Sequence, residues 1–141
     1  MSCKNVDDTG LSALPSFPAL RALMPMDVPD EGFRHVGRYE GLEEPWLMYC
    51  RNTGDAATER NAGLSWLKTY YAGKTKVTDH SLEILGCMPS LEKIEFWECA
   101  GITDAGVALL ACLPRLRAIT VRGSPNVTRE GIAVFPSAVR V

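Results

Sequence analysis

The chain has 141 residues, 46% hydrophobic and 23% charged, a composition typical of a single globular domain that can bury its own core. Its formal net charge of −2 provides no general attraction to phosphate backbones or anionic lipids, so neither nucleic acid nor a membrane surface is an expected partner. The N-terminus lacks the apolar stretch of a signal peptide and no apolar run approaches the roughly 18 residues that span a bilayer, so we expect one cytoplasmic domain over residues 1–141.

A repeating pattern runs along the chain. Anchor positions recur at intervals of 22, 25, 24, 25 and 25 residues, at Val6, Val28, Thr53, Val77, Ile102 and Val127. Fourteen residues after each anchor comes a second apolar position, at Leu20, Leu42, Leu67, Leu91, Leu116 and Val141. Each interval therefore predicts one structural unit that begins at its anchor.

Each unit is predicted to form a helix followed by a strand, most clearly in residues 77–91 and 102–116, which match column by column. Thr78 begins one of these helices with an N-cap hydroxyl, and Asp79 places a carboxylate at the positive end of the helix dipole. Apolar residues follow at helical spacing until a proline ends the helix, and an alternating segment then predicts a half-buried strand. The acidic residues at these helix starts are expected to be structural.

Two units depart from this pattern. Residues 56–63, in the third unit, lack strong apolar positions, so we expect a short or irregular helix there. In the sixth unit, Pro136 limits the predicted helix to residues 130–135, and residues 139–141 supply the last predicted strand.

One column of the aligned units contains only small residues. It lies four residues after each anchor and holds Gly10, Gly32, Ala57, Ser81, Gly106 and Gly131. Such a column indicates close packing of each helix on its neighbour. Because a unit of 22–25 residues cannot bury its own apolar face, the units must stack into an α/β solenoid with a parallel sheet on one side and helices on the other.

Residues 91–114, LEKIEFWECAGITDAGVALLACLP, combine an apolar strand, a cysteine, an I-T-D-x-G segment and a C-x-P helix end. This pattern resembles the cysteine-containing class of leucine-rich repeats over nearly the whole chain. Proteins with such repeats include F-box receptors of ubiquitin ligases, proteins similar to ATP-synthase coupling factor B, and bacterial leucine-rich-repeat proteins. The resemblance implies a solenoid of about five to six repeats, with the sheet concave and the helices convex, and a role in binding partners without a shared reaction. An F-box-like segment is not evident ahead of the repeats, so direct recruitment to a ubiquitin ligase is not expected.

The strand register predicts which side chains face away from the helices. When Leu91, Ile94 and Phe96 point into the core, the alternate residues of that strand face outward. The same register in the other strands produces an outward strip rich in aromatic residues and methionine, with charged residues at its rim, which is typical of binding surfaces. The predicted partner-binding residues are Met24, Met26, Trp46, Met48, Tyr71, Lys93, Glu95, Trp97 and Arg122. A purely structural role, in which the aromatic side chains stack together or lie under a terminal segment, is the alternative.

Few residues suggest catalysis. The histidines, His35 and His80, are both expected on the helical side, away from the loop cysteines Cys50 and Cys99, and no phosphate-loop or zinc-protease motif is present. An odd number of cysteines, five, without paired metal-site spacing favours reduced thiols that fill the core. We therefore expect no catalytic residue, no metal and no cofactor.

Three functions remain open from the sequence. The first is a protein-protein interaction module that binds its partner through the concave sheet face. The second is a structural or assembly-factor solenoid that forms homo-oligomers through its open ends. The third, an enzyme that uses Cys50 or Cys99, requires a reactive thiol of lowered pKa.

Overall fold

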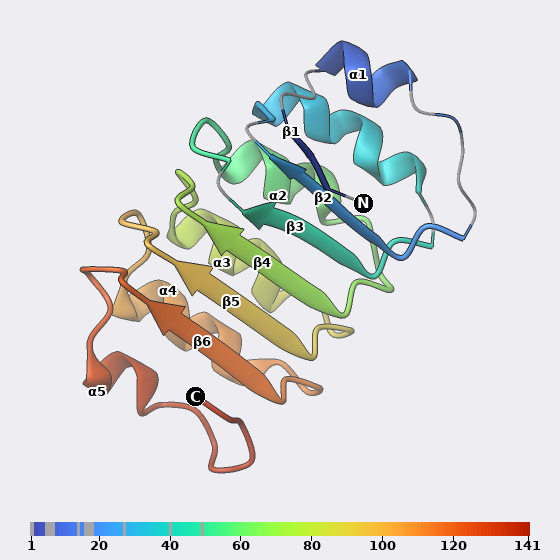
Figure 1. Ribbon diagram of the computed structural model, residues 1–141. Helices are drawn as coiled ribbons and strands as arrows, with labels where there is room; N and C mark the ends of the chain where they lie inside the picture. The colour runs from blue at the N-terminus through green and yellow to red at the C-terminus, as the bar shows by residue number, and fades with distance from the viewer. Residues whose placement is uncertain are drawn as a thin grey trace.

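The computed structural model describes residues 2–4, 8–13, 15, 19–26, 28–39, 41–48 and 50–141. In this part of the chain, six strands form one parallel sheet in sequential order (Figure 1). The strands are β1 (Ser2–Lys4), β2 (Ala22–Met26), β3 (Glu44–Met48), β4 (Thr69–Gly73), β5 (Lys93–Trp97) and β6 (Ala118–Arg122). The helices are α1 (Asp8–Ala13), η1 (Asp30–Arg38), α2 (Asp55–Asn61), α3 (Asp79–Gly86), α4 (Asp104–Leu109), η2 (Leu110–Cys112) and α5 (Arg129–Ile132). The α/β class and the open parallel sheet are confirmed.

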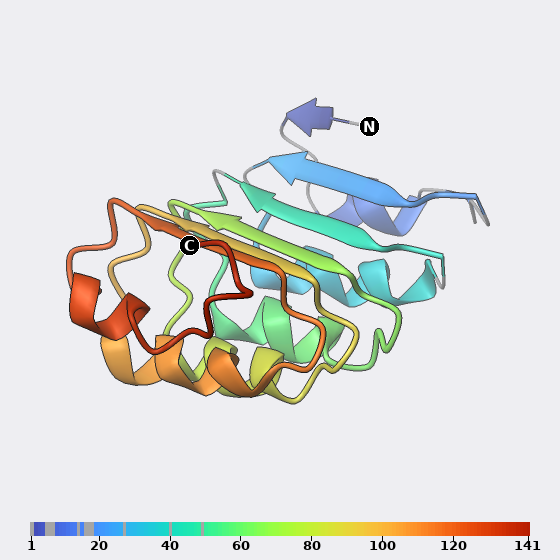
Figure 2. The ribbon, with the colours of Figure 1, turned by 90° about the horizontal axis from the view of Figure 1, so that it is seen from below.

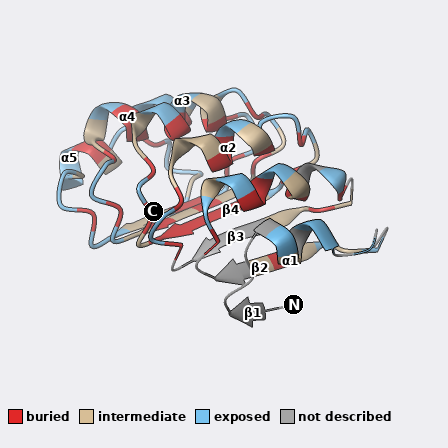
Figure 3. Cartoon of the chain, turned by 90° about the horizontal axis from the view of Figure 1, so that it is seen from above, coloured by how far each residue is buried: buried red, intermediate tan, exposed pale blue. Residues whose placement is uncertain are grey.

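The chain forms two layers. All of the helices lie against one face of the sheet, and the opposite face carries no helix in the part of the chain that the structure describes (Figure 2). Burial follows this arrangement, because the helix surfaces that face the sheet are buried while their outer surfaces are exposed (Figure 3). The described helices therefore leave one face of the sheet uncovered.

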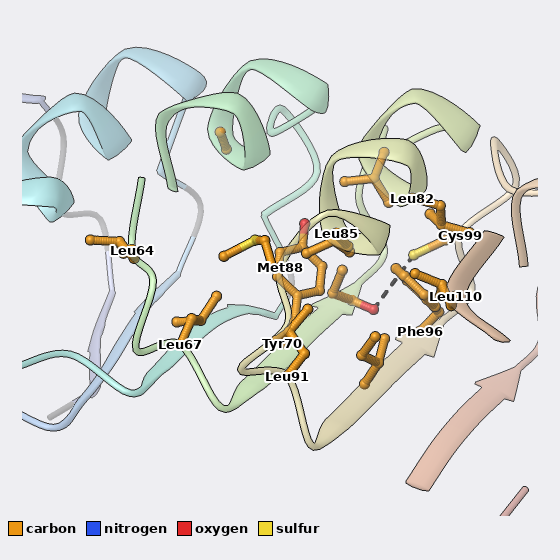
Figure 4. Packing of buried hydrophobic residues seen from close by; sticks show 14 of the residues in the cluster. Leu64, Leu67, Tyr70, Leu82, Leu85, Met88, Leu91, Phe96, Cys99 and Leu110 are labelled. Carbon is orange, nitrogen blue, oxygen red and sulfur yellow. Dashed lines mark hydrogen bonds between the residues drawn. The ribbon is translucent and has the colours of Figure 1, made fainter. Parts of the chain in front are cut away.

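The core lies between these layers and contains the two apolar columns of the sequence pattern. The anchors Val28, Val77 and Ile102 are fully buried, as are the second-column leucines Leu42, Leu67 and Leu91. Figure 4 shows leucines from α3 packed toward Tyr70 and Phe96, which extend from the sheet. Thr53, which replaces an apolar anchor, is also buried, because its hydroxyl donates to the Val28 carbonyl at 2.6 Å. The Thr53 hydroxyl is therefore hydrogen-bonded although it is buried, and the residue occupies the same core position as the apolar anchors of the other units.

The helix of the third unit, expected to be short or irregular, is short but regular, because α2 is an α-helix of seven residues. Buried hydroxyls replace the missing apolar contacts. Thr58 lies 2.7 Å from the Tyr70 hydroxyl and 2.9 Å from Ser81 Oγ, and all three residues are fully buried. The irregular helix lies one unit earlier, where η1 is a 3-10 helix that contains two glycines, the residues that weaken an α-helix most after proline.

Aspartates at the first positions of four helices link each helix to the next. Each carboxylate accepts a hydrogen bond from the backbone N–H of the residue that caps the following helix. Where the cap is threonine, its hydroxyl also donates to the carboxylate. Asp79, for example, accepts one hydrogen bond from the backbone N–H of Thr103, with an N–O distance of 2.8 Å, and a second from the Thr103 hydroxyl, with an O–O distance of 2.6 Å. We call this set the carboxylate ladder, whose members are Asp30, Asp55, Asp79 and Asp104. The structural role predicted for these acids is confirmed, and it extends beyond the helix dipole to the neighbouring helix.

The carboxylate ladder explains the column of small residues. A Cβ atom on Gly106 would overlap the Asp79 carboxylate, and one on Gly131 would overlap that of Asp104. Ser81 occupies the same column, and its hydroxyl donates to Asp55 Oδ1 at 2.5 Å. The close helix packing predicted from this column is confirmed. The small side chains leave space between neighbouring helices, and the aspartate carboxylates occupy that space.

The two edges of the sheet differ from the sequence prediction. Strand β1 precedes the first anchor and was not predicted, although it pairs with β2 at three positions. The strand predicted at residues 139–141 is reduced to one bridge between Arg140 and Ala118. In the described part of the chain, the backbone bonds on the outer side of β6 are those from Ile119 N to Arg140 O and from Arg140 N to Arg117 O.

Candidate functional site

The helix-free face of the sheet carries the side chains that the register predicts to face outward. In β5, Ile94 and Phe96 are buried, whereas Lys93, Glu95 and Trp97 are half-buried, so the predicted alternation is confirmed. Parallel pairing aligns these positions across strands. One row contains Tyr71, Glu95 and Thr120, and the next contains Gly73, Trp97 and Arg122. We call these two rows, together with Lys93, the outward face.

Charged side chains surround the rings of the outward face. Lys93 Nζ lies 2.6 Å from Glu95 Oε1 and 5.2 Å from the centre of the Tyr71 ring. Lys74 Nζ lies 3.5 Å from Glu98 Oε2 and 4.9 Å from the Trp97 ring centre. The hydrogen bond that Lys93 donates to Glu95 is the main cause that raises the pKa of Lys93, and burial opposes this effect only in part. Two lysines therefore provide cation-π contacts while each is paired with a glutamate.

The predicted partner-binding residues differ in accessibility. Trp97 is half-buried and Arg122 is exposed, while Met24, in β2, is half-buried. Tyr71 is only 6% exposed, so its ring is less accessible than its outward register predicts, and Lys93 Nζ lies over that ring. The remaining predicted residues have side chains outside the described part of the structure, namely Met26, Trp46 and Met48. The backbone of Trp46 is nevertheless paired with that of Tyr71, as the predicted register requires.

A shallow pocket lies at the ends of β5 and β6. Its volume is about 300 Å³, and its lining includes Glu95, Trp97, Thr120 and Arg122, together with Ala72 and Phe96. Thr120 lies in the same outward row as Glu95 but was not among the predicted binding residues. Lys74 was missed entirely, because it lies beyond the alternating segment, in a left-handed backbone conformation with φ 56°. No sequence period identifies a cation placed over a ring in the next strand.

The cysteines occupy two environments. Cys50 and Cys99 are fully buried, as expected of core residues, and Cys99 Sγ lies 3.4 Å from Thr75 Oγ1 in the adjacent loop. Cys87 and Cys112 are exposed, so the expectation that they fill the core is wrong. Both lie at helix C-terminal ends, beyond the surface that packs on the sheet. The burial of Cys50 and Cys99 leaves neither thiol accessible to a substrate in this conformation.

His80 lies on the helical layer, as predicted. Its ring nitrogens are 3.0 Å from Glu59 Oε1 and 3.3 Å from Glu83 Oε2. These two hydrogen bonds, chiefly the one with Glu59, raise the pKa of His80 above its ordinary value. Among the residues that the structure describes, no group of three or more His, Cys, Asp or Glu side chains is placed to hold a metal ion.

We expect a proton NMR titration of His80 to show a midpoint above 6.5, and Glu59→Gln to lower it. Because the folded pKa is raised, the stabilisation from His80 is fully present below the unfolded pKa and is lost as pH rises through the folded pKa. Glu130→Gln, an equal charge change at an exposed site on α5, is the control and leaves the midpoint unchanged. A midpoint insensitive to Glu59→Gln contradicts the pairing.

Among the residues that the structure describes, no helix is long and apolar enough to cross a membrane. No protein-family model matches this chain, and no curated protein matches it.

Proposed function

We propose that this chain is a leucine-rich-repeat solenoid of the cysteine-containing class, and that it binds a protein partner through the outward face of its sheet. The carboxylate ladder supports the repeat assignment, since equivalent aspartates at intervals of 25, 24 and 25 residues make equivalent bonds to the following helix. A parallel sheet with strands in sequential order and helices on one face is the arrangement that stacked strand-helix units produce.

One observation carries the binding proposal. The helix-free face places Trp97 and Arg122 side by side in register, at a pocket of about 300 Å³. Tryptophan and arginine are the residue types enriched most in interface hot spots, together with tyrosine.

The first test is Trp97→Ala, which we expect to weaken partner binding about 30-fold, equivalent to about 2 kcal/mol at a hot spot. The partner is first captured from lysate of the source cells, then purified, and its affinity is measured by isothermal titration calorimetry. Leu109→Ala is the matched control, because Leu109 is a 41% exposed apolar residue on α4, in the helical layer. Circular dichroism and the melting temperature establish that both variants fold. Equal affinities of wild type and Trp97→Ala contradict binding through this face.

Self-association is the alternative function, and the open edge of β6 favours it. An edge strand presents unpaired backbone groups to a second chain, and the described contacts on the outer side of β6 include only the bridge to Arg140. Sedimentation velocity over a wide concentration range distinguishes the two functions. A concentration-dependent dimer supports the alternative, and a monomer that still binds a partner supports the proposal.

A further inference from the structure

The charges of the outward face are unevenly matched. Lys93 is paired with Glu95 at 2.6 Å, and Lys74 with Glu98 at 3.5 Å. Arg122 is exposed, and its guanidinium makes no ion pair or hydrogen bond with any residue that the structure describes. The pocket lining contains one acid and one base. The charge of Glu95 is paired with Lys93, which lies outside the lining, whereas the positive charge of Arg122 has no ion partner among the described residues.

The position of Arg122 places that charge beside apolar and hydroxyl groups. Arg122 is paired in register with Trp97, and Thr120 with Glu95, so the four side chains surround the pocket. A volume of about 300 Å³ lies at the lower limit of small-molecule sites and accommodates a few side chains of an extended segment. The indole offers an apolar contact, and the guanidinium offers a planar pair of N–H donors that matches a carboxylate.

From this juxtaposition we propose that the pocket binds an acidic segment of the partner protein. An aspartate or glutamate carboxylate pairs with Arg122, and a neighbouring apolar side chain of the same segment packs on Trp97. Glu95 sets the position of the acid, because a carboxylate seated toward β5 meets a like charge, whereas one seated over β6 does not. This inference rests on the proposed function and specifies the chemistry of its partner.

The test is a selection from a library of random dodecapeptides, displayed with linkers on both sides so that no free C-terminal carboxylate is present. We expect peptides enriched on wild type to carry Asp or Glu next to an apolar residue. The best peptide is then synthesised with amidated ends, together with its Glu→Gln or Asp→Asn analogue, and measured by calorimetry. Arg122→Gln is expected to lower the affinity for the acidic peptide at least about tenfold, and to leave the affinity for the amide analogue unchanged.

Three further variants sharpen the result. Arg122→Lys retains the charge without the two-pronged geometry, so its loss of affinity is intermediate. Glu95→Gln removes the like charge and releases Lys93, so it strengthens acidic-peptide binding severalfold. Arg129→Gln, which removes an exposed arginine from α5 in the helical layer, is the control and has no effect.

The outcomes separate this inference from the proposed function. If binding of the selected peptides requires Trp97 but shows no preference for acidic residues and does not require Arg122, the inference is overturned. The proposed function is then still supported. Failure to enrich any peptide overturns the inference, while the proposed function is still tested by the partner's affinity for Trp97→Ala. The affinities of wild type and Arg122→Gln for the acidic peptide and for its amide analogue form a double-mutant cycle. If the two changes lower the affinity independently, Arg122 does not pair with the peptide carboxylate and the inference is overturned.

Discussion

Gly106→Ala is expected to lower the free energy of unfolding by about 1–3 kcal/mol, the range typical of an overpacked site. A Cβ atom at position 106 overlaps the Asp79 carboxylate and lies 3.0 Å from the Asp79 Cβ, so the aspartate must move away from Thr103. The direction is notable because alanine ordinarily stabilises a helix relative to glycine by roughly 0.5–1 kcal/mol. Urea denaturation followed by circular dichroism measures the change.

Gly63→Ala is the matched control. A Cβ atom there meets nothing within 4 Å, so the substitution is expected to be neutral or to stabilise the chain by about 0.4–1 kcal/mol. Asp79→Ala supplies the second comparison, since it vacates the space that a methyl group at position 106 requires. The double variant is expected to be about as stable as Asp79→Ala alone. If the losses of unfolding free energy from Gly106→Ala and Asp79→Ala instead add in the double variant, Gly106 is required for a reason other than the Asp79 carboxylate.

The positions of β2 to β6 could be predicted from the sequence because the apolar columns repeat in register, whereas β1 precedes the first column and was not predicted. The burial of β5 alternates as the leucine column and a period of two predict, whereas in β4 the predicted outward residues Tyr71 and Gly73 are buried. Helix type was predicted less well, because apolar periodicity cannot detect stabilisation by buried hydroxyls. Thr58 and Ser81 look like weak core residues in the sequence, yet each is fully buried and hydrogen-bonded.

The candidate site was predicted in outline only. The register predicts that Trp97 and Arg122 are neighbours, but which charges are paired depends on side-chain geometry. Lys93 could have paired with a residue on either adjacent strand, and it pairs with Glu95 on its own strand. The same side-chain geometry places Lys93 Nζ over the Tyr71 ring. Period and composition contain no information about these rotamers.

Asp55→Ala is expected to destabilise the chain by about 2–4 kcal/mol, since it removes the acceptor of three hydrogen bonds to a charged group. Thr78 donates to Asp55 through its N–H at 2.8 Å and its hydroxyl at 2.7 Å, and Ser81 through its hydroxyl at 2.5 Å. Thermal denaturation at neutral pH measures the loss. Ser81→Ala removes one donor and keeps the carboxylate, so a smaller loss is expected from it.

The same carboxylate makes stability depend on acid. Burial opposes ionisation of Asp55, but the hydrogen bonds from Ser81 and Thr78 outweigh it and lower its pKa below the ordinary value of 3.8. The folded pKa is depressed, so this stabilisation is present above about pH 3.8 and is lost as pH falls through the folded pKa. Asp55→Asn should therefore be less stable than wild type at neutral pH and lose less stability on acidification. If both proteins show the same slope of unfolding free energy below pH 3.8, the acid sensitivity arises elsewhere, and the bonds of Asp55 stabilise the stack without coupling it to pH.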